Sequence, residues 1–298
     1  EFPSHGEKWT DIMADVESMI MPGITHWQHP RFFAFYPANS SPAAVLGDML
    51  ASMFNVIGFS WESCPASTEL EMLVLDQLAQ AVGLPDVFLS DGEGGGVIQG
   101  SASDSTLVAL ISARERALTH MRRVNPGVDD HELMAKMTLY ASDQVSQATQ
   151  KRGAHIALSP LRARDNSHNI DFSAAHSSVQ KAANIAGLGA NMRVIPASGR
   201  SASADDSAYA LDPADLAAAM EEDLAAGLTP MFVTANVGST NSCAIDPVLA
   251  IGKVSEGLVP WLHVDSAYAG SAAVCPENRW ILDGVEAADS VMFNVHKW

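Results

Sequence analysis

Helix-like and strand-like segments alternate along this chain from about residue 65 onward, and this alternation restricts its fold more than any other feature. Apolar, strand-like runs lie at residues 138–142, 192–196, 231–237, 260–264 and 290–293. Helix-like stretches separate several of them, at residues 178–185, 213–225 and 247–256. Strands that alternate with helices are typical of α/β folds. The sequence therefore predicts a mostly parallel sheet flanked by helices.

Local signals predict where individual helices begin. Thr68, followed three residues later by Glu71, has the spacing of a capping box. The apolar residues that follow recur at helical spacing on one face: Leu70, Leu73, Val74, Leu78 and Val82. This spacing predicts an amphipathic helix that ends before Gly83. Asp212, followed by a proline, predicts a second helix start with the aspartate as N-cap.

Composition excludes several classes of function. The 298 residues are 47% hydrophobic and 17% charged, with a net charge of −18. So acidic a chain predicts neither a nucleic-acid nor a membrane partner, and no apolar run reaches the roughly 18 residues that span a bilayer. Cys64, Cys243 and Cys275 fit neither a disulfide framework nor a zinc site, so we expect no metal and a reducing compartment. The start lacks the layout of a signal peptide, and we expect a cytoplasmic protein.

The glycine-rich stretch at residues 92–100 matches neither common nucleotide motif. No three of its glycines have the i, i+2, i+5 spacing of the dinucleotide fingerprint, and Ser101-Ala102 replaces the Lys-Ser/Thr of a P-loop. What remains is a turn with two hydroxyls, Ser101 and Ser103, at the start of a helix-like run. Backbone N–H groups and the helix dipole make such a start a phosphate site. A tight turn with an N-cap serine is the simpler alternative.

Asp265 and Lys297 each follow a strand-like run. Open α/β sheets bind ligands where parallel strands end. An aspartate and a lysine placed in this way suit pyridoxal phosphate (PLP): the lysine forms a Schiff base with the cofactor aldehyde, and the acid keeps the pyridine nitrogen protonated. A helix cap for Asp265 and a solvated surface position for Lys297 are the alternatives. The pair predicts a PLP-dependent enzyme.

Residues 145–174 differ from the rest of the chain. Four of the 17 basic residues lie there, and the segment has neither helical nor strand periodicity. A loop of that length inside a compact domain is usually functional or disordered. His176 follows directly and precedes a helix-like segment. Its ring would suit stacking on a planar cofactor, and a satisfied polar group is the simpler alternative.

Several longer motifs resemble the PLP-dependent group II amino-acid decarboxylases, above all those that act on aromatic L-amino acids. They are the segments 20–27, 32–34, 57–61, 94–103, 175–179, 263–265 and 296–298. The resemblance covers nearly the whole chain. It implies the large α/β domain of the type I PLP-dependent transferases (aspartate-aminotransferase-like) and a homodimer. The implied activity is decarboxylation of aromatic L-amino acids to the corresponding amines and carbon dioxide.

The resemblance also implies roles for matching residues. The expected catalytic residues are Lys297, which would carry the cofactor, Asp265, which would pair with its ring nitrogen, and His176, which would stack on its ring. The expected cofactor-binding residues are Ser101, Ala102, Ser103, His176, Thr240, Asp265, Ala267, Asn294, His296 and Lys297. The expected substrate lining is Trp27, Phe35, Tyr36, Ile57 and Phe59. Of these, Ile57 and Phe59 would reach across the dimer interface.

Two departures from the family pattern shape the expected domains. The family lacks residues 145–174, which we interpret as an insertion; a retained intron or gene-model error is one hypothesis and a surface insertion the other. The family also continues past the lysine into a mobile catalytic loop and a small domain, so we expect a truncated chain without that small domain. We expect a helical N-terminal segment at 1–65, contributing to the dimer and substrate pocket, and an incomplete PLP-binding large domain at 66–298.

Three other functions remain open. An aromatic acetaldehyde synthase shares the scaffold but releases an aldehyde, ammonia and peroxide; His176 favours simple decarboxylation over it. Histidine decarboxylase is a further relative, and the segment 99–103 favours the aromatic enzymes over it. A chain that keeps the cofactor contacts without turnover is the alternative outside enzymes.

Overall fold

The computed structural model describes residues 4–36, 38–143, 177–197, 209–240, 242–255 and 260–297. Its centre is a sheet of five strands in the order β2-β1-β3-β4-β5, and every neighbouring pair is parallel. The strands are β1 (Met137–Asp143), β2 (Met192–Pro196), β3 (Thr229–Asn236), β4 (Trp261–Ser266) and β5 (Ser290–Phe293). The predicted parallel α/β sheet is therefore confirmed, and each predicted strand corresponds to one observed strand.

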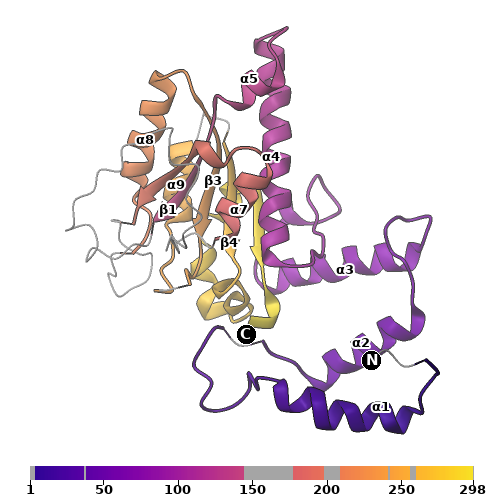
Figure 1. Cartoon of the computed structure of the whole chain (residues 1–298). Helices are drawn as coiled ribbons and strands as arrows, with labels where there is room; N and C mark the ends of the chain where they lie inside the picture. The colour runs from indigo at the N-terminus through magenta and orange to yellow at the C-terminus, as the bar shows by residue number, and fades with distance from the viewer. Residues whose placement is uncertain are drawn as a thin grey trace.

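Helices lie on both faces of this sheet, and the N-terminal residues form an extension beyond the end of the sheet where the C-terminal residues of the described chain lie (Figure 1). The α-helices are α1 (Trp9–Asp15), α2 (Pro42–Phe54), α3 (Pro65–Ala81), α4 (Ala102–Val124), α5 (Asp130–Met134), α7 (Ser178–Ile185), α8 (Pro213–Ala225) and α9 (Val248–Ser255). A π-helix, η1 (Val16–Ile20), continues α1. The 3-10 helices are η2 (Met21–Gly23), η3 (Asp86–Phe88), η4 (Gly189–Asn191), η5 (Ala269–Val274), η6 (Pro276–Leu282), η7 (Val285–Ala287) and η8 (Val295–Lys297).

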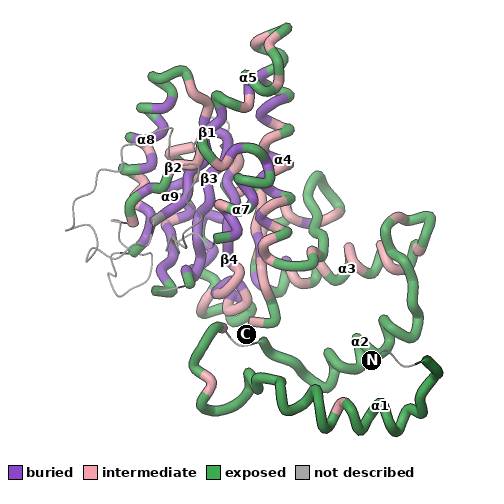
Figure 2. Tube along the Cα trace, viewed as in Figure 1, coloured by how far each residue is buried: buried purple, intermediate pink, exposed green. Residues whose placement is uncertain are grey.

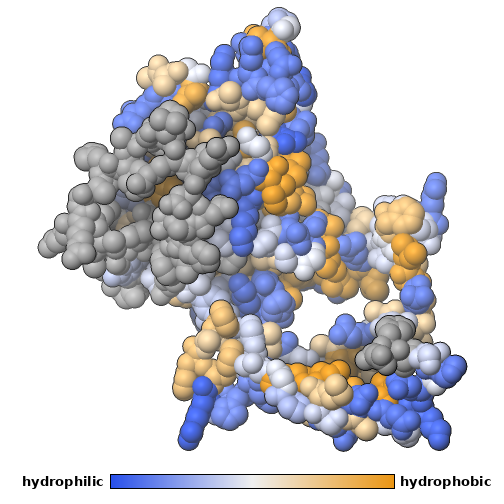
Figure 3. All heavy atoms as spheres, in the orientation of Figure 1, coloured by the Kyte–Doolittle hydropathy of each residue, from blue (hydrophilic) through white to orange (hydrophobic). Residues whose placement is uncertain are grey.

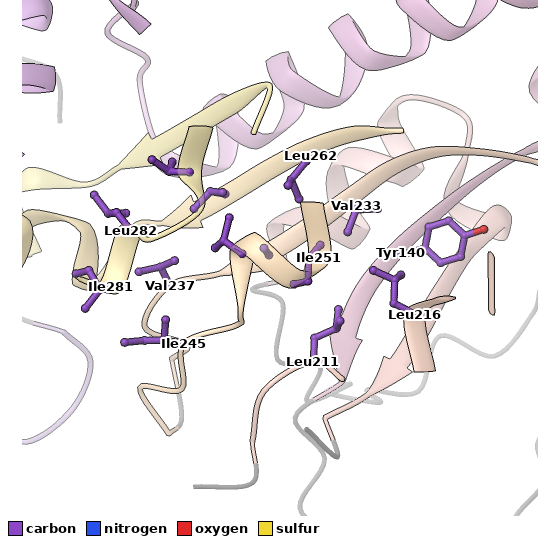
Figure 4. Close-up of a cluster of buried hydrophobic side chains, with 14 of the residues drawn as sticks. Tyr140, Leu211, Leu216, Val233, Val237, Ile245, Ile251, Leu262, Ile281 and Leu282 are labelled. Atoms are coloured by element: carbon purple, nitrogen blue, oxygen red, sulfur yellow. The ribbon is translucent and has the colours of Figure 1, made fainter. Parts of the chain in front are cut away.

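Two apolar layers enclose the sheet, because successive residues of a strand point to opposite faces. Leu139 and Phe232 belong to the cluster that packs against α4, α5 and α7. Their neighbours Tyr140 and Val233 belong to the cluster on the other face, with α8, α9 and η6, part of which Figure 4 shows. Burial is concentrated in these layers (Figure 2). Both faces of the sheet are therefore covered, as a parallel sheet requires.

The two predicted helix starts have different outcomes. Asp212 caps α8 as predicted, since its Oδ1 accepts a hydrogen bond from Ala214 N at 2.8 Å. The capping box at Thr68 is wrong: α3 begins three residues earlier, at Pro65, so Thr68 lies inside the helix. Glu71 instead accepts a hydrogen bond from Ile98 N at 2.7 Å. A proline suits the first turn of a helix because it has no N–H to leave unpaired, and this preference outweighs the spacing signal.

The N-terminal arm, defined here as residues 4–64, extends away from the sheet and is almost entirely exposed (Figures 1 and 2). Apolar side chains on α2 stand in solvent, with Met49 62% and Met53 67% exposed. The exposed apolar surface continues onto the first half of α3, where Leu70 is 59% exposed. Apolar atoms accordingly gather on the arm in the space-filling view (Figure 3). The predicted division into segments 1–65 and 66–298 stays a prediction.

Within the described ranges, no helix combines the length and the apolar character needed to cross a membrane.

Candidate active site

The carboxyl ends of β3, β4 and β5 bring three predicted residues to one edge of the sheet. Asp265 is the fifth of the six residues of β4, and Thr240 follows β3. Lys297 lies in η8, directly after β5. The register places Asp265 beside Asn236 of β3 and Met292 of β5. This edge is where open α/β sheets bind their ligands.

Asp265 is a buried carboxylate, with 8% of its surface exposed. Its Oδ1 accepts a hydrogen bond from Ala267 N at 3.1 Å, and its backbone oxygen accepts one from Val237 N at 2.8 Å. It takes part in none of the salt bridges formed among the described residues. Because burying an unpaired charge is costly, this carboxylate suits a cationic group of a bound molecule.

Lys297 is half-buried at the same edge. Burial lowers the pKa of Lys297, and the negative charge of Asp265 acts in the opposite direction. The η8 turn that presents the lysine is closed by a hydrogen bond from Lys297 N to Asn294 O at 3.1 Å. A lowered pKa raises the fraction of free amine at neutral pH, which is the nucleophilic form.

Tyr36 comes from the N-terminal arm to this edge. Its hydroxyl donates to Thr240 O at 2.7 Å, and its ring stacks on Tyr268 with centroids 4.0 Å apart and an interplanar angle of 14°. The Nζ of Lys297 lies over the Tyr36 ring, 5.4 Å from its centroid. Tyr36 was predicted in the substrate lining, and Tyr268 had no predicted role. The only signal for Tyr268 was its position three residues after Asp265.

The predicted phosphate segment starts α4. The Ser101 hydroxyl caps this helix, accepting from Asp104 N at 3.2 Å and donating to Asp104 Oδ2 at 2.9 Å. Ala102 and Ser103 form the first turn. The N-terminal end of α4 lies at the same end of the sheet as the C-terminal end of the described chain (Figure 1). Ser101 therefore occupies the N-cap position that the simpler alternative described, and the phosphate role of this segment stays a prediction.

The remaining predicted residues are only partly gathered. His296 is exposed, and its backbone oxygen accepts a hydrogen bond from Asn39 N at 2.8 Å. Trp27 stacks on Phe35, with centroids 5.5 Å apart, but Phe35 is 81% exposed. Ile57 and Phe59 are 71% and 82% exposed. The single chain therefore leaves most of the predicted substrate lining open to solvent. His176 and the predicted insertion at 145–174 lie outside the described residues.

His263, two residues before Asp265 on β4, received no predicted role. Burial lowers the pKa of His263 to about 4, so its ring is neutral near pH 7. Trp261 Nε1 donates to Ser290 Oγ at 2.7 Å, and the same oxygen lies 2.8 Å from His263 Nδ1. No sequence pattern distinguishes such a buried histidine from an ordinary one.

Asp246 is a second buried group without a predicted role. Burial raises the pKa of Asp246 to about 6, against hydrogen bonds that lower it. Its two oxygens accept from Leu211 N at 2.8 Å and from Asn236 N at 2.7 Å. Asn236 in turn donates from Nδ2 to Ser142 Oγ at 2.8 Å. Asp246 therefore fastens the end of β3, beside Asp265, to the neighbouring segments.

These groups together fit PLP. A buried carboxylate that forms no salt bridge within the described ranges suits the pyridine nitrogen, a half-buried lysine of lowered pKa suits the aldehyde, and a serine-capped helix start suits the phosphate. The fold and this edge thus describe a PLP-binding α/β domain. The family described as "Pyridoxal-dependent decarboxylase conserved domain" matches residues 1–172 and 168–298, and the chain belongs to this family.

Individual relatives agree with this assignment. The chain is 44% identical over 298 residues to phenylacetaldehyde synthase of Arabidopsis thaliana, covering 99% of this chain and 52% of that protein. It is 43% identical over 298 residues to aromatic-L-amino-acid decarboxylase of Cavia porcellus, covering 99% and 54%. The crystal structure of Oryza sativa TDC with PLP and tryptamine superposes with a TM-score of 0.83, at 41% identity, covering all of this chain and 53% of that one.

The predicted fold and cofactor are confirmed, since PLP decarboxylases share this fold and PLP is their cofactor. The chain spans about half the length of the curated relatives it matches.

Proposed function

We propose that this protein catalyses the PLP-dependent decarboxylation of aromatic L-amino acids to amines and carbon dioxide. The observation that carries the proposal is the Asp265–Lys297 pair: a buried carboxylate without a salt bridge in the described part, electrostatically coupled to a half-buried lysine. The relatives named for aromatic substrates support the choice of substrate class.

Each residue then has a definite task. PLP, when bound, supplies an electron sink that stabilises the carbanion left by loss of carbon dioxide. The Lys297 amine would hold the cofactor covalently, and the Asp265 carboxylate would keep its ring nitrogen protonated by a charge-assisted hydrogen bond. Ser101 and the first turn of α4 bind the phosphate with hydroxyl and backbone N–H donors. Burial of Asp265 strengthens its interaction because water does not screen it.

Aromatic side chains near the site support an aromatic substrate. Trp27 stacks on both Phe32 and Phe35, at centroid distances of 5.3 and 5.5 Å. Tyr36 and Tyr268 form a second stacked pair beside Lys297. Flat apolar surfaces of this kind favour a flat apolar ligand through buried area and ring packing.

We also propose a homodimer, in which the N-terminal arm packs against a second copy. On α2, Leu46, Met49, Leu50 and Met53 recur at i, i+3, i+4 and i+7 spacing, and each is at least 49% exposed. Monomeric proteins rarely expose an apolar surface of this extent. Ile57 and Phe59, exposed just beyond α2, would then reach the partner's site.

An aromatic acetaldehyde synthase is the second candidate, supported by the phenylacetaldehyde synthase relative at 44% identity. The two activities share the cofactor and the predicted binding residues, so their products distinguish them. Decarboxylation yields the amine. The synthase consumes oxygen and water and yields aldehyde, carbon dioxide, ammonia and peroxide. The third candidate is a chain that binds PLP without turnover.

The test begins with purified protein incubated with PLP and reduced with borohydride. We expect peptide mass spectrometry to locate the cofactor on Lys297, with none on the exposed Lys253. Lys297→Ala should lose the label and reduce turnover to background, whereas Lys253→Ala should retain both. Asp265→Asn should lower turnover about a hundredfold, the scale of removing one electrostatic group from an active site.

Products then decide among the candidates. L-tryptophan, L-tyrosine, L-DOPA and L-phenylalanine are each supplied, and amine, aldehyde and peroxide are quantified. Amine with no peroxide supports the decarboxylase, and equimolar aldehyde and peroxide support the synthase. Label on Lys297 without any product supports the non-catalytic chain and contradicts our proposal.

A further inference from the structure

We propose that Tyr36 is a positioning residue for Lys297: its ring face holds the ammonium group at the cofactor edge, while its hydroxyl fixes the ring to Thr240. The inference rests on Lys297 being the reactive amine. This role differs from lining a substrate pocket. A pocket lining needs only apolar bulk, whereas a cation–π interaction with Lys297 needs an aromatic ring face.

Three contacts from separate parts of the chain hold the Tyr36 ring. Its hydroxyl donates to the backbone oxygen of Thr240, a residue that follows β3, at 2.7 Å. Its face stacks on Tyr268, after β4, with centroids 4.0 Å apart. The Lys297 ammonium, after β5, lies 5.4 Å from the ring centroid, inside the roughly 6 Å range of a cation–π interaction. The ring therefore joins the ends of three neighbouring strands.

The backbone beside Tyr36 is also fastened to the site. Asn39 N donates to His296 O at 2.8 Å, and Gln28 Nε2 donates to Ala38 O at 2.7 Å. Phe35 has a φ of 61°, a left-handed conformation that is uncommon outside glycine. The two adjacent rings contact different groups: Phe35 stacks on Trp27, whereas the Tyr36 ring lies under the Nζ of Lys297. The segment thus places one specific ring against Lys297.

The charges around Lys297 are consistent with this task. Burial disfavours the ammonium form, and Asp265 on β4 favours it. Burial raises the pKa of Tyr36 to about 12, with Cys243 and Tyr268 adding to the effect, so its hydroxyl stays protonated and remains a donor. His296 precedes Lys297 in η8 and is exposed. The Tyr36 ring is uncharged, and its negative face favours the ammonium form of Lys297 in addition to the Asp265 carboxylate.

The experiment measures the pKa of Lys297 in the cofactor-free protein. The rate at which an amine-reactive reagent modifies Lys297 is followed by mass spectrometry across pH, with the exposed Lys181 and Lys253 as internal references. Position 36 carries tyrosine, phenylalanine, leucine, or phenylalanines with increasing ring fluorination, which weaken the negative ring face at nearly constant shape. Phe33→Leu is the matched control, since Phe33 is 89% exposed on the same arm.

We expect Tyr36→Phe and the control to keep the wild-type pKa of Lys297. Tyr36→Leu and the most fluorinated ring should lower it by about half a unit to one unit, with intermediate rings between. A pKa that stays constant across the fluorinated series, or rises in Tyr36→Leu, would overturn the proposal. Because this readout needs no cofactor, it measures the Tyr36–Lys297 contact separately from the proposed function: failure of PLP to attach to Lys297 would contradict the proposed function without changing the measured effect of the ring on the pKa.

Discussion

At the residue scale, the site depends on buried charges whose partners lie far away in the sequence. Lys297 and Asp265 are 32 positions apart, and Tyr36 approaches them from the N-terminal arm. Positions after strand-like runs predicted the lysine and the aspartate as cofactor residues, and that role stays a prediction. Such positions could not identify the ring over the lysine, since that contact depends on where the arm returns to the sheet.

His263 permits a prediction about pH. Its pKa falls from 6.5 in the unfolded chain to about 4 in the folded one, so the unfolded state binds more protons between these values. Stability should therefore decrease as pH falls from about 6.5 to 4, by on the order of 3 kcal/mol from this group. Asp246 acts in the opposite direction, since its raised pKa favours the folded state as pH falls through about 6.

The comparison of wild type with His263→Phe isolates the histidine. Urea unfolding at pH 7.0, 5.5 and 4.5 gives the free energy of unfolding of each. The wild type should lose more stability on acidification than the variant does, because the phenylalanine ring of the variant has no proton to gain. Equal losses in the two proteins would show that His263 is not held neutral by the fold.

At the element scale, helix-like spacing in the sequence predicted the bounds of two helices correctly. The segments predicted at 178–185 and 213–225 are the observed α7 and α8. The start of α3 was predicted three residues too late. The helix begins at Pro65, and Glu71 accepts a hydrogen bond from Ile98 N instead of capping the helix. A side chain that satisfies a backbone donor 27 residues away cannot be recognised from i, i+3 spacing.

Glu71 therefore connects α3 to the loop that precedes Ser101. Glu71→Ala should free Ile98 N and speed its hydrogen exchange roughly fivefold, the size expected for losing about 1 kcal/mol of hydrogen bonding. Glu71→Gln, which keeps an acceptor oxygen, should stay close to wild type. Exchange at residues 97–100, followed by mass spectrometry, measures both. Unchanged exchange in Glu71→Ala would mean that the loop is held by other contacts.

At the scale of the whole molecule, the buried sheet contrasts with an arm whose apolar residues stand in solvent (Figure 2). The apolar side chains on both faces of the sheet are covered by the helices that pack on them. The apolar side chains of the arm are not covered, since helices α1 and α2 contain no buried residue. An apolar helix in water is stable only when something covers it, and a second copy of the chain is the partner we propose.

The proposed homodimer predicts a clear effect of charge on α2. Met49→Glu combined with Met53→Glu should convert a dimer to a monomer, because two buried carboxylates would replace apolar contacts. Ala51→Glu, on the opposite side of the same helix, should leave the dimer intact. Analytical ultracentrifugation gives the mass of each. A wild-type protein that sediments as a monomer at micromolar concentration would contradict the proposal.

The sequence by itself determined the order of elements and the parallel sheet, and it predicted the chemistry at the sheet edge. Each of these depends on short-range signals: strand-like runs, helix starts, and a lysine and an acid at strand ends. Tertiary structure alone decided the Tyr36 contact, the neutral state of His263 and the exposure of the substrate-lining residues. These depend on burial and on contacts between distant segments. The spacing of residues along a chain does not show which side chains the folded protein shields from water.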